Sequence, residues 1–222
     1  MQPYVQQELQ QKLPQKVQQH SVGGARVLRG ALAAAVVIAI SGCSAEQAAP
    51  TEAPHVAFFN ALHSLCGNAY AGERIVERPG QDLLEGDEAL TVHFRECSET
   101  EIKAPFHIEQ PATNTWDRSR TWIYSLAGDH LTINHDHREP DGSHSEHTFY
   151  GGATVDSGTA EQQMFIYTER TGDAGEVLGW RIEVVPGKRY SYGTMADGEW
   201  TWRIDFDLTT TIALPPAPWG FE

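Results

Sequence analysis

From Gly67 onward, turn-forming residues interrupt the chain at intervals of roughly ten positions, and this punctuation constrains the fold more than any other feature. The interruptions are rich in Gly, Pro and Asp, which favour tight turns. They are Pro79-Gly80, Gly86-Asp87, Gly128-Asp129, Pro140-Asp141-Gly142, Gly151-Gly152, Gly172-Asp173, Pro186-Gly187 and Asp197-Gly198. The runs between them are rich in Val, Ile, Thr and aromatic residues, which favour strands. The spacing predicts strands over 69–77, 88–97, 101–108, 118–126, 130–138, 144–150, 162–169, 179–185, 188–195 and 199–208.

Apolar residues occupy every second position in several of these runs, which is the period of a strand with one buried face. Examples are Leu90, Val92 and Phe94; Ile102, Ala104, Phe106 and Ile108; Trp180, Ile182 and Val184; and Trp200, Trp202, Ile204, Phe206 and Leu208. Tight turns make neighbouring strands antiparallel, and closing the sheet on itself leaves no unpaired edge. We therefore expect an all-β fold, a closed up-and-down barrel of about eight to ten strands. A two-sheet β-sandwich is the alternative.

One helix is expected before the strands. Val56, Phe59, Leu62 and Cys66 recur at helical spacing, and Gly67 can adopt the left-handed conformation that ends a helix, so the pattern predicts a helix over 55–65. A short helix leading into an antiparallel barrel resembles the lipocalin-type (calycin) architecture, and this resemblance implies a ligand cavity inside the barrel. The barrel domain would then cover residues 55–208, with the Pro-rich segment 209–222 laid over it as a strap.

Residues 26–43 have the layout of a bacterial export signal: arginines, then an apolar run too short to span a membrane. Ile40-Ser41-Gly42-Cys43 resembles the lipobox of bacterial lipoproteins, which implies cleavage before Cys43 and a lipid on its thiol. The alternative is a buried helix with a chance cysteine. We expect residues 1–42 to be dispensable, residues 43–54 to form a flexible tether, and the anchored protein to face the periplasm from the outer membrane.

The 180 residues from Cys43 onward suffice for one domain and contain 12 of the 16 Lys and Arg but 29 of the 30 Asp and Glu. This acidity disfavours binding to nucleic acid, which requires basic patches. Cys66 and Cys97 would enter an oxidising compartment after export, so we expect a disulfide between them; two free buried thiols are the alternative. We expect the domain to be a monomer.

The densest group of histidines lies in 131–152, which is predicted to form a hairpin around Pro140-Asp141-Gly142. Counting outward from that turn gives three opposed pairs: His135 with His147, His137 with Ser145, and Ile133 with Phe149. The three histidines of the predicted inward face, His135, His137 and His147, would then lie among apolar residues. They could bind a transition metal or haem, or hydrogen-bond the polar end of a ligand. The alternative is a solvated hairpin beyond the barrel rim whose histidines bind nothing.

Three arginines, Arg95, Arg118 and Arg120, fall on nearby predicted strands with Trp122. Arginine with aromatic residues can clamp a ligand carboxylate through paired charge-assisted hydrogen bonds, so Arg95, Arg120 and Trp122 are candidate ligand contacts. The alternative is that these arginines pair with acidic neighbours of the same chain, such as Asp117.

No complete set of nucleophile, base and orienting residue occurs in the chain, so we name no catalytic residue. The string Asp156-Ser157-Gly158 resembles the loop of aspartic proteases, but that mechanism needs two such loops and this chain has one. We expect a non-enzymatic binder or carrier of a small, partly apolar ligand, with no cofactor. The alternatives are an envelope hydrolase or isomerase, or a metal or haem protein that uses the histidine hairpin.

Overall fold

The structure, a computed structural model, describes residues 52–78, 84, 86 and 88–222. The predicted export signal, the lipobox and most of the predicted tether fall outside these residues. The helix and strands of the described part are α1 Pro54–His63, β1 Ala69–Glu77, β2 Leu90–His93, β3 Glu96–Cys97, β4 Glu101–Gln110, β5 Thr115–Ala127, β6 His130–His137, β7 Tyr150–Thr154, β8 Gln162–Ile166, β9 Leu178–Val185, β10 Arg189–Ala196 and β11 Glu199–Asp207.

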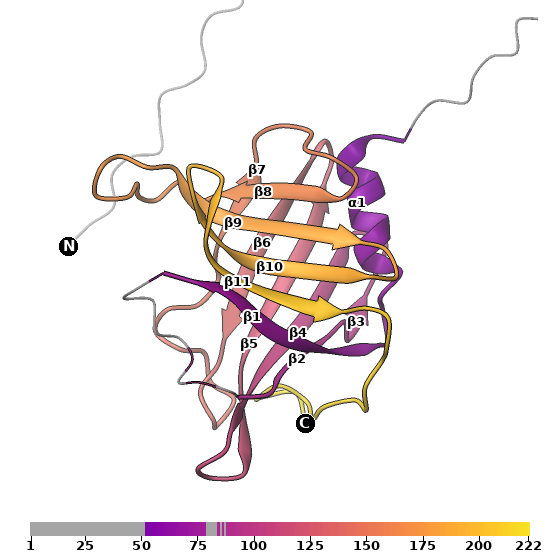
Figure 1. Cartoon of the computed structure of the whole chain (residues 1–222), viewed down its shortest axis with the longest axis vertical. Coiled ribbons are helices and arrows are strands. Elements are labelled where there is room, and N and C mark those ends of the chain that lie inside the picture. Colours follow the sequence, from indigo (N-terminus) through magenta and orange to yellow (C-terminus); the bar gives the residue numbers. More distant parts are fainter. Residues whose placement is uncertain (1–51, 79–83, 85, 87) are drawn as a thin grey trace, which may run out of the picture. The chain divides into compact units, whose positions relative to one another are not determined.

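Ten of the strands close into one antiparallel barrel (Figure 1). The hydrogen-bonded order runs β1, β11, β10, β9, β8, β7, β6, β5, β4, β2 and back to β1, while the short β3 pairs with β4 beyond the end of β2. The predicted barrel is thereby confirmed and the sandwich alternative is wrong. Closure gives every strand of the ring two neighbours, which removes the exposed edges that an open meander would have.

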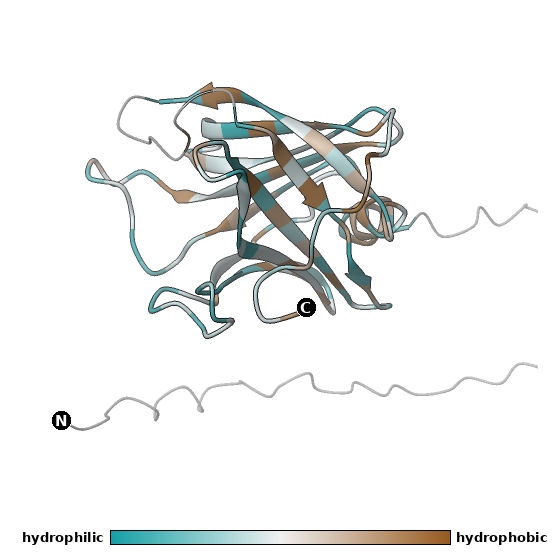
Figure 2. Cartoon of the chain, turned by 90° about the horizontal axis from the view of Figure 1, so that it is seen from below, coloured by the Kyte–Doolittle hydropathy of each residue, from teal (hydrophilic) through white to brown (hydrophobic). Residues whose placement is uncertain are grey.

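The core follows the alternation of the sequence, and Figure 2 shows hydrophobic and hydrophilic residues alternating along the strands. On β4, for example, Ile102, Ala104 and Phe106 are almost completely buried. The largest fully buried side chains include Trp122, Tyr124 and Tyr190, so the barrel interior is filled largely by aromatic rings.

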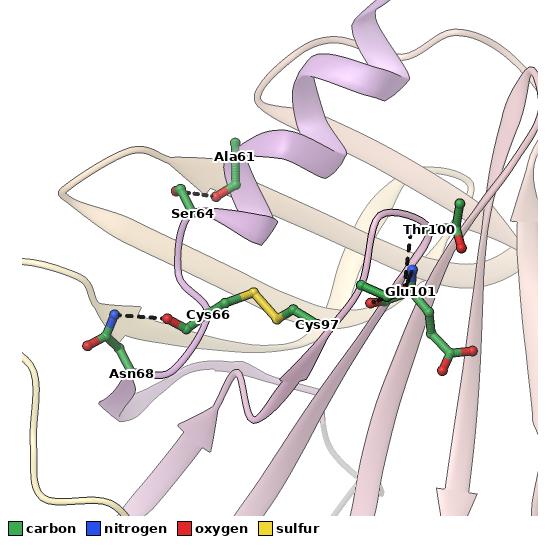
Figure 3. The surroundings of a disulfide bond; sticks show 8 residues. Ala61, Ser64, Cys66, Asn68, Cys97, Thr100 and Glu101 are labelled. Atoms are coloured by element: carbon green, nitrogen blue, oxygen red, sulfur yellow. Dashed lines mark hydrogen bonds between the residues drawn. A yellow bond between two sulfur atoms is a disulfide. The ribbon is translucent and has the colours of Figure 1, made fainter.

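Helix α1 packs against β8 and β9 and closes one end of the barrel (Figure 1). Phe58, Phe59 and Leu62 on its inner side belong to the barrel core. The chain then turns at Gly67, whose φ of 81° is the left-handed value that the sequence predicted there. The predicted disulfide is present between Cys66 and Cys97, and it ties the segment after the helix to β3 (Figure 3).

Two predicted strands differ from the structure by more than a few residues at their ends. The run 88–97 forms two strands, β2 and β3, separated by Phe94 and Arg95. The predicted strand 144–150 was wrong: its residues up to Phe149 form a loop, and β7 begins at Tyr150. The loop forms an isolated bridge between His144 and Arg138 and is bonded to β6 through the amides of Ser145 and Phe149, which donate to His137 O at 3.0 Å and to His135 O at 2.7 Å.

The C-terminal segment 209–222 crosses the outside of the barrel from β1 to β5. The Ile212 amide donates to Ala69 O on β1 at 2.9 Å, and Arg118 on β5 donates through Nη1 to Ala217 O at 2.5 Å. In the order of the barrel, β2 and β4 lie between these two points, and their outward-facing residues Thr91 and His107 are buried. This segment, which we call the strap, therefore covers a polar part of the outer wall.

Candidate functional site

The register between β5 and β6 arranges the inward side chains in tiers along the barrel. Successive opposed pairs are Leu126 with Leu131, Tyr124 with Ile133, Trp122 with His135, and Arg120 with His137. The turn between these strands lies near the start of α1, because Asp129 and His130 line a surface depression together with His55. The leucine tier is therefore at the closed end, and the tier of Arg120 and His137 is the farthest from the helix.

A cavity of about 440 Å³ occupies the barrel at these outer tiers. It is lined by Phe106, Arg120, Trp122, His135, His137, Tyr150, Trp180, Tyr192, Thr194 and Trp202. Small-molecule sites commonly have volumes of about 300–1,000 Å³ and mostly apolar walls with a few polar groups, and this cavity fits both criteria.

The indole of Trp122 forms the floor of the cavity together with the rings on either side of it. Its ring is stacked on Tyr192 with centroids 3.7 Å apart and on Phe106 with centroids 5.0 Å apart. These residues come from β5, β10 and β4, so the stack spans the barrel interior and seals the core beneath. Stacked aromatic side chains lose little conformational entropy on contact and present a flat, rigid surface.

His135 is held on one wall by contacts to both ring nitrogens. Its Nδ1 lies 3.2 Å from Tyr150 O and its Nε2 lies 2.5 Å from the Tyr192 hydroxyl. A carbonyl oxygen can only accept, so we assign the proton of the neutral ring to Nδ1 and the donated hydrogen at Nε2 to Tyr192. The imidazole also stacks on Tyr150 with centroids 4.8 Å apart. Neither nitrogen is left free for another partner.

Burial fixes the protonation of this pair. It lowers the pKa of His135 to about 3, although the hydrogen bond to Tyr150 O acts in the opposite direction. Burial also raises the pKa of Tyr192 well above its ordinary value of 10. At neutral pH both groups are uncharged, so the wall around them is neutral and polar.

The outermost tier is more polar. The pKa of His137 is lowered first by burial and then by the nearby Arg120 guanidinium, and its Nε2 lies 3.0 Å from the Tyr150 hydroxyl. Arg120 forms an ion pair with Asp117. Burial alone would raise the pKa of Asp117, but Arg120 and the hydrogen bonds of Ser119 lower it below its ordinary value.

The structure brings four of the six predicted ligand contacts together: Arg120, Trp122, His135 and His137 all line the cavity. The other two were placed wrongly. His147 is exposed in the loop before β7, because β6 and β7 pair His135 with Tyr150 and not with His147. Arg95 lies on the outer wall, where its Nη2 donates to Phe221 O of the strap at 3.0 Å.

The prediction of a three-histidine metal site fails on the same register, since only His135 and His137 share a face. Across the residues that the structure describes, no group of three His, Cys, Asp or Glu side chains is placed to hold a metal ion. The Asp156 loop connects β7 to β8, and Asp156 Oδ1 accepts the Gly158 amide at 2.9 Å within its own turn.

Comparisons with protein-family models, with curated proteins and with solved structures found no match for this chain. No helix of the described part is long and apolar enough to cross a membrane.

Six cavity residues were not among the predicted ligand contacts: Phe106, Tyr150, Trp180, Tyr192, Thr194 and Trp202. The alternation does place Phe106, Trp180 and Trp202 on the inward face. Alternation predicts which residues face inward, but it does not distinguish those packed in the core from those that line a cavity. That distinction depends on how far along the barrel the side chains fill the interior.

Proposed function

We propose that this protein is a non-enzymatic binder of a small molecule with a flat, partly apolar part, which enters the barrel and lies on the Trp122 floor. The observation that carries the proposal is the cavity of about 440 Å³ with six aromatic residues in its lining. Aromatic walls favour a flat apolar group, because stacked or edge-to-face ring pairs add roughly 0.5–1.5 kcal/mol each beyond the buried area.

The protonation states in the cavity support binding over proton-transfer chemistry. A general acid or base works best with a pKa near the operating pH. His135, with a pKa of about 3, and Tyr192, with a pKa well above 10, are both far from neutrality, and each already satisfies the other. A metal or haem iron at His135 Nε2 would have to displace the Tyr192 hydroxyl.

The proposal is tested by native mass spectrometry of the full chain purified from a bacterial host. A bound small molecule, released on denaturation and identified by its mass, is the expected result. The same molecule should rebind to the emptied protein and quench the tryptophan fluorescence, since three of the lining residues are tryptophans.

A matched pair of variants locates the site. Thr194→Phe places a ring in the cavity mouth and is expected to abolish rebinding, whereas Thr132→Phe adds the same ring to the outer face of β6 and should leave it intact. Equal binding by both variants, or an empty protein that rebinds nothing from a host extract, would refute the proposal. Conversion of the released molecule to a product would favour an enzyme instead.

The proposal includes a place in the cell. The lipobox-like Ile40-Ser41-Gly42-Cys43 supports a protein anchored by lipid at Cys43 in the cell envelope, with the barrel in the periplasm. A binder held at the membrane surface would meet small molecules that cross or leave that membrane.

A further inference from the structure

Arg120 is a cation in the lining of this largely aromatic cavity, and among the described residues only its Nη1 has a hydrogen-bond partner. Its Nη1 donates to Asp117 Oδ2 and to Ser119 Oγ. In the described part of the chain, Nε and Nη2 of Arg120 have no acceptor, and neither is among the buried unpartnered atoms, so both remain accessible. One edge of the guanidinium is thus fixed, and the Nε–Nη2 edge is open.

That open edge matches one chemical group particularly well. Nε–H and Nη2–H point in parallel with the spacing of the two oxygens of a carboxylate, and such bidentate pairs are among the strongest hydrogen bonds in proteins. Asp117 holds the opposite side of the guanidinium, which limits its rotation and orients the open edge before a ligand arrives.

Asp117 does not cancel the positive charge within the cavity. The pKa of His137 is lowered first by burial and then by the charge of Arg120, while Asp117 and Asp136 act in the opposite direction. Arg120 also opposes the burial-driven rise in the pKa of Tyr150 and of Tyr192. The positive charge of Arg120 is therefore felt at His137, Tyr150 and Tyr192 on the cavity wall, and it favours an anion there.

We infer that the ligand is a flat carboxylic acid whose carboxylate pairs with the Nε–Nη2 edge of Arg120 while its apolar part lies on the Trp122 floor. This inference rests on the proposed function and specifies the class of ligand. The tiers give the orientation: Arg120 lies one pair farther from the closed end than Trp122, so the acid group sits at the mouth and the ring points inward.

The test compares two probes of the same shape, 2-naphthoate and 2-naphthamide, by isothermal titration calorimetry on the full chain. Both carry the same bicyclic ring, and only the first carries a negative charge. The carboxylate is expected to bind at least about tenfold more tightly than the amide, because a charge-assisted bidentate pair replaces neutral hydrogen bonds.

Arg120→Gln is expected to remove this preference and leave the two probes with similar affinity. Arg118→Gln is the matched control: it lies two residues away on the same strand, but its side chain bonds the strap at Ala217 O, so the preference should persist. Because Arg120→Gln leaves Asp117 unpaired, the double variant Asp117→Asn with Arg120→Gln removes both charges and must show the same loss of preference.

The outcomes distinguish a failure of the carboxylate inference from a failure of the proposed binding function. Equal binding of both probes by the unaltered protein, or a carboxylate preference that survives in both Arg120 variants, overturns the carboxylate inference and leaves the binding function standing. If neither probe binds and no molecule is found in the purified protein, the proposed function fails together with the inference.

Discussion

The first prediction concerns His107 and the effect of its buried imidazole on the stability of the protein. The His107 side chain faces outward from β4 on the part of the wall that the strap crosses, and it is fully buried. In the described part of the chain neither ring nitrogen has a hydrogen-bond partner of good geometry, although the Asp117 carboxylate and backbone act to raise its pKa. Burial, helped by the charges of Arg118 and His93, lowers its pKa from 6.5 to about 4. Replacing this imidazole by leucine, an apolar side chain of similar size, should therefore stabilise the protein, and more so in acid.

The magnitude follows from proton linkage. The unfolded chain binds a proton at His107 below pH 6.5, whereas the folded chain does so only near pH 4, so the stability that depends on the neutral ring falls as the pH drops through this window. The loss is about 2 kcal/mol at pH 5 and reaches about 3 kcal/mol below pH 4. His107→Leu has no proton to bind and avoids this loss.

The assay is urea unfolding followed by tryptophan fluorescence at pH 8 and pH 5. At pH 8 the variant should be at least as stable as the unaltered protein, because an unpaired buried polar group costs free energy that an apolar side chain does not. At pH 5 its advantage should grow by about 2 kcal/mol. Titrating groups that do not interact with His107, such as His135, are common to both proteins and cancel in the difference.

His147→Leu serves as the control: His147 is exposed, so its replacement removes no buried imidazole and should not reproduce the gain in acid expected of His107→Leu. The reasoning is refuted if His107→Leu gains the same free energy at pH 5 as at pH 8. Such a result would mean that the strap opens, or admits water, before the ring is protonated.

Three further predictions concern other parts of the molecule. Replacing Cys66 and Cys97 by alanine should lower the free energy of unfolding by about 3–4 kcal/mol, because the bridge spans a separation of 31 residues; a loss below about 1 kcal/mol in urea unfolding would contradict this. Tyr192→Phe leaves His135 Nε2 buried without a donor and should cost about 1–3 kcal/mol in the same assay, whereas an unchanged stability would show that the hydrogen bond contributes nothing. Cys43→Ser should move the protein from the membrane fraction to the soluble fraction of a bacterial host, and mass spectrometry of the unaltered protein should find an acylated N-terminal cysteine; recovery of residues 1–42 on the mature protein would exclude it.

The sequence predicted the barrel because the signals that specify it are local. Period-two alternation marks the inward face of each strand, and Gly, Pro and Asp mark most of the turns. The left-handed Gly67 was predictable for the same reason, since it depends on the helix that it ends. The disulfide was predictable because Cys66 and Cys97 are the two cysteines that remain once Cys43 is assigned to the lipid.

The histidine hairpin shows where local signals stop being sufficient. Gly151 and Gly152 were interpreted as a turn, but they lie within β7, where a Cβ would collide with the carbonyl oxygens of Ile133 on β6 and of Ile166 on β8. These glycines permit β6, β7 and β8 to approach closely, so strand pairing resumes at β7. The loop before Tyr150 contains the extra residues that shift the register between β6 and β7. The turn at Pro140-Asp141-Gly142 was correct, and the register beyond it was shifted by an odd number of residues, which turned His147 outward.

A similar slip affects Trp200, which alternation placed on the inward face. A bulge between the pairs of Thr194 and Met195 changes the parity, and Trp200 lies between the guanidinium groups of Arg181 and Arg203. Bulges depend on pairing between strands, and a single sequence contains no direct signal for them.

A second bulge, on β5, determines which of its charged residues face the cavity and which face the strap. Phe106 pairs with Arg120 but Ile108 pairs with Asp117, so β5 contains one residue more than β4 over this interval. Without it, Arg118 and Arg120 would face the same way, as strict alternation predicts, and two cations would compete for one anion. With it, Asp117 joins Arg120 and orients the candidate ligand contact, while Arg118 turns outward and binds the strap. The strap and the mouth of the cavity thus both depend on residues 117–120 of β5. A change that shifts this bulge would therefore disturb the strap's contact with the outer wall and the position of Arg120 together.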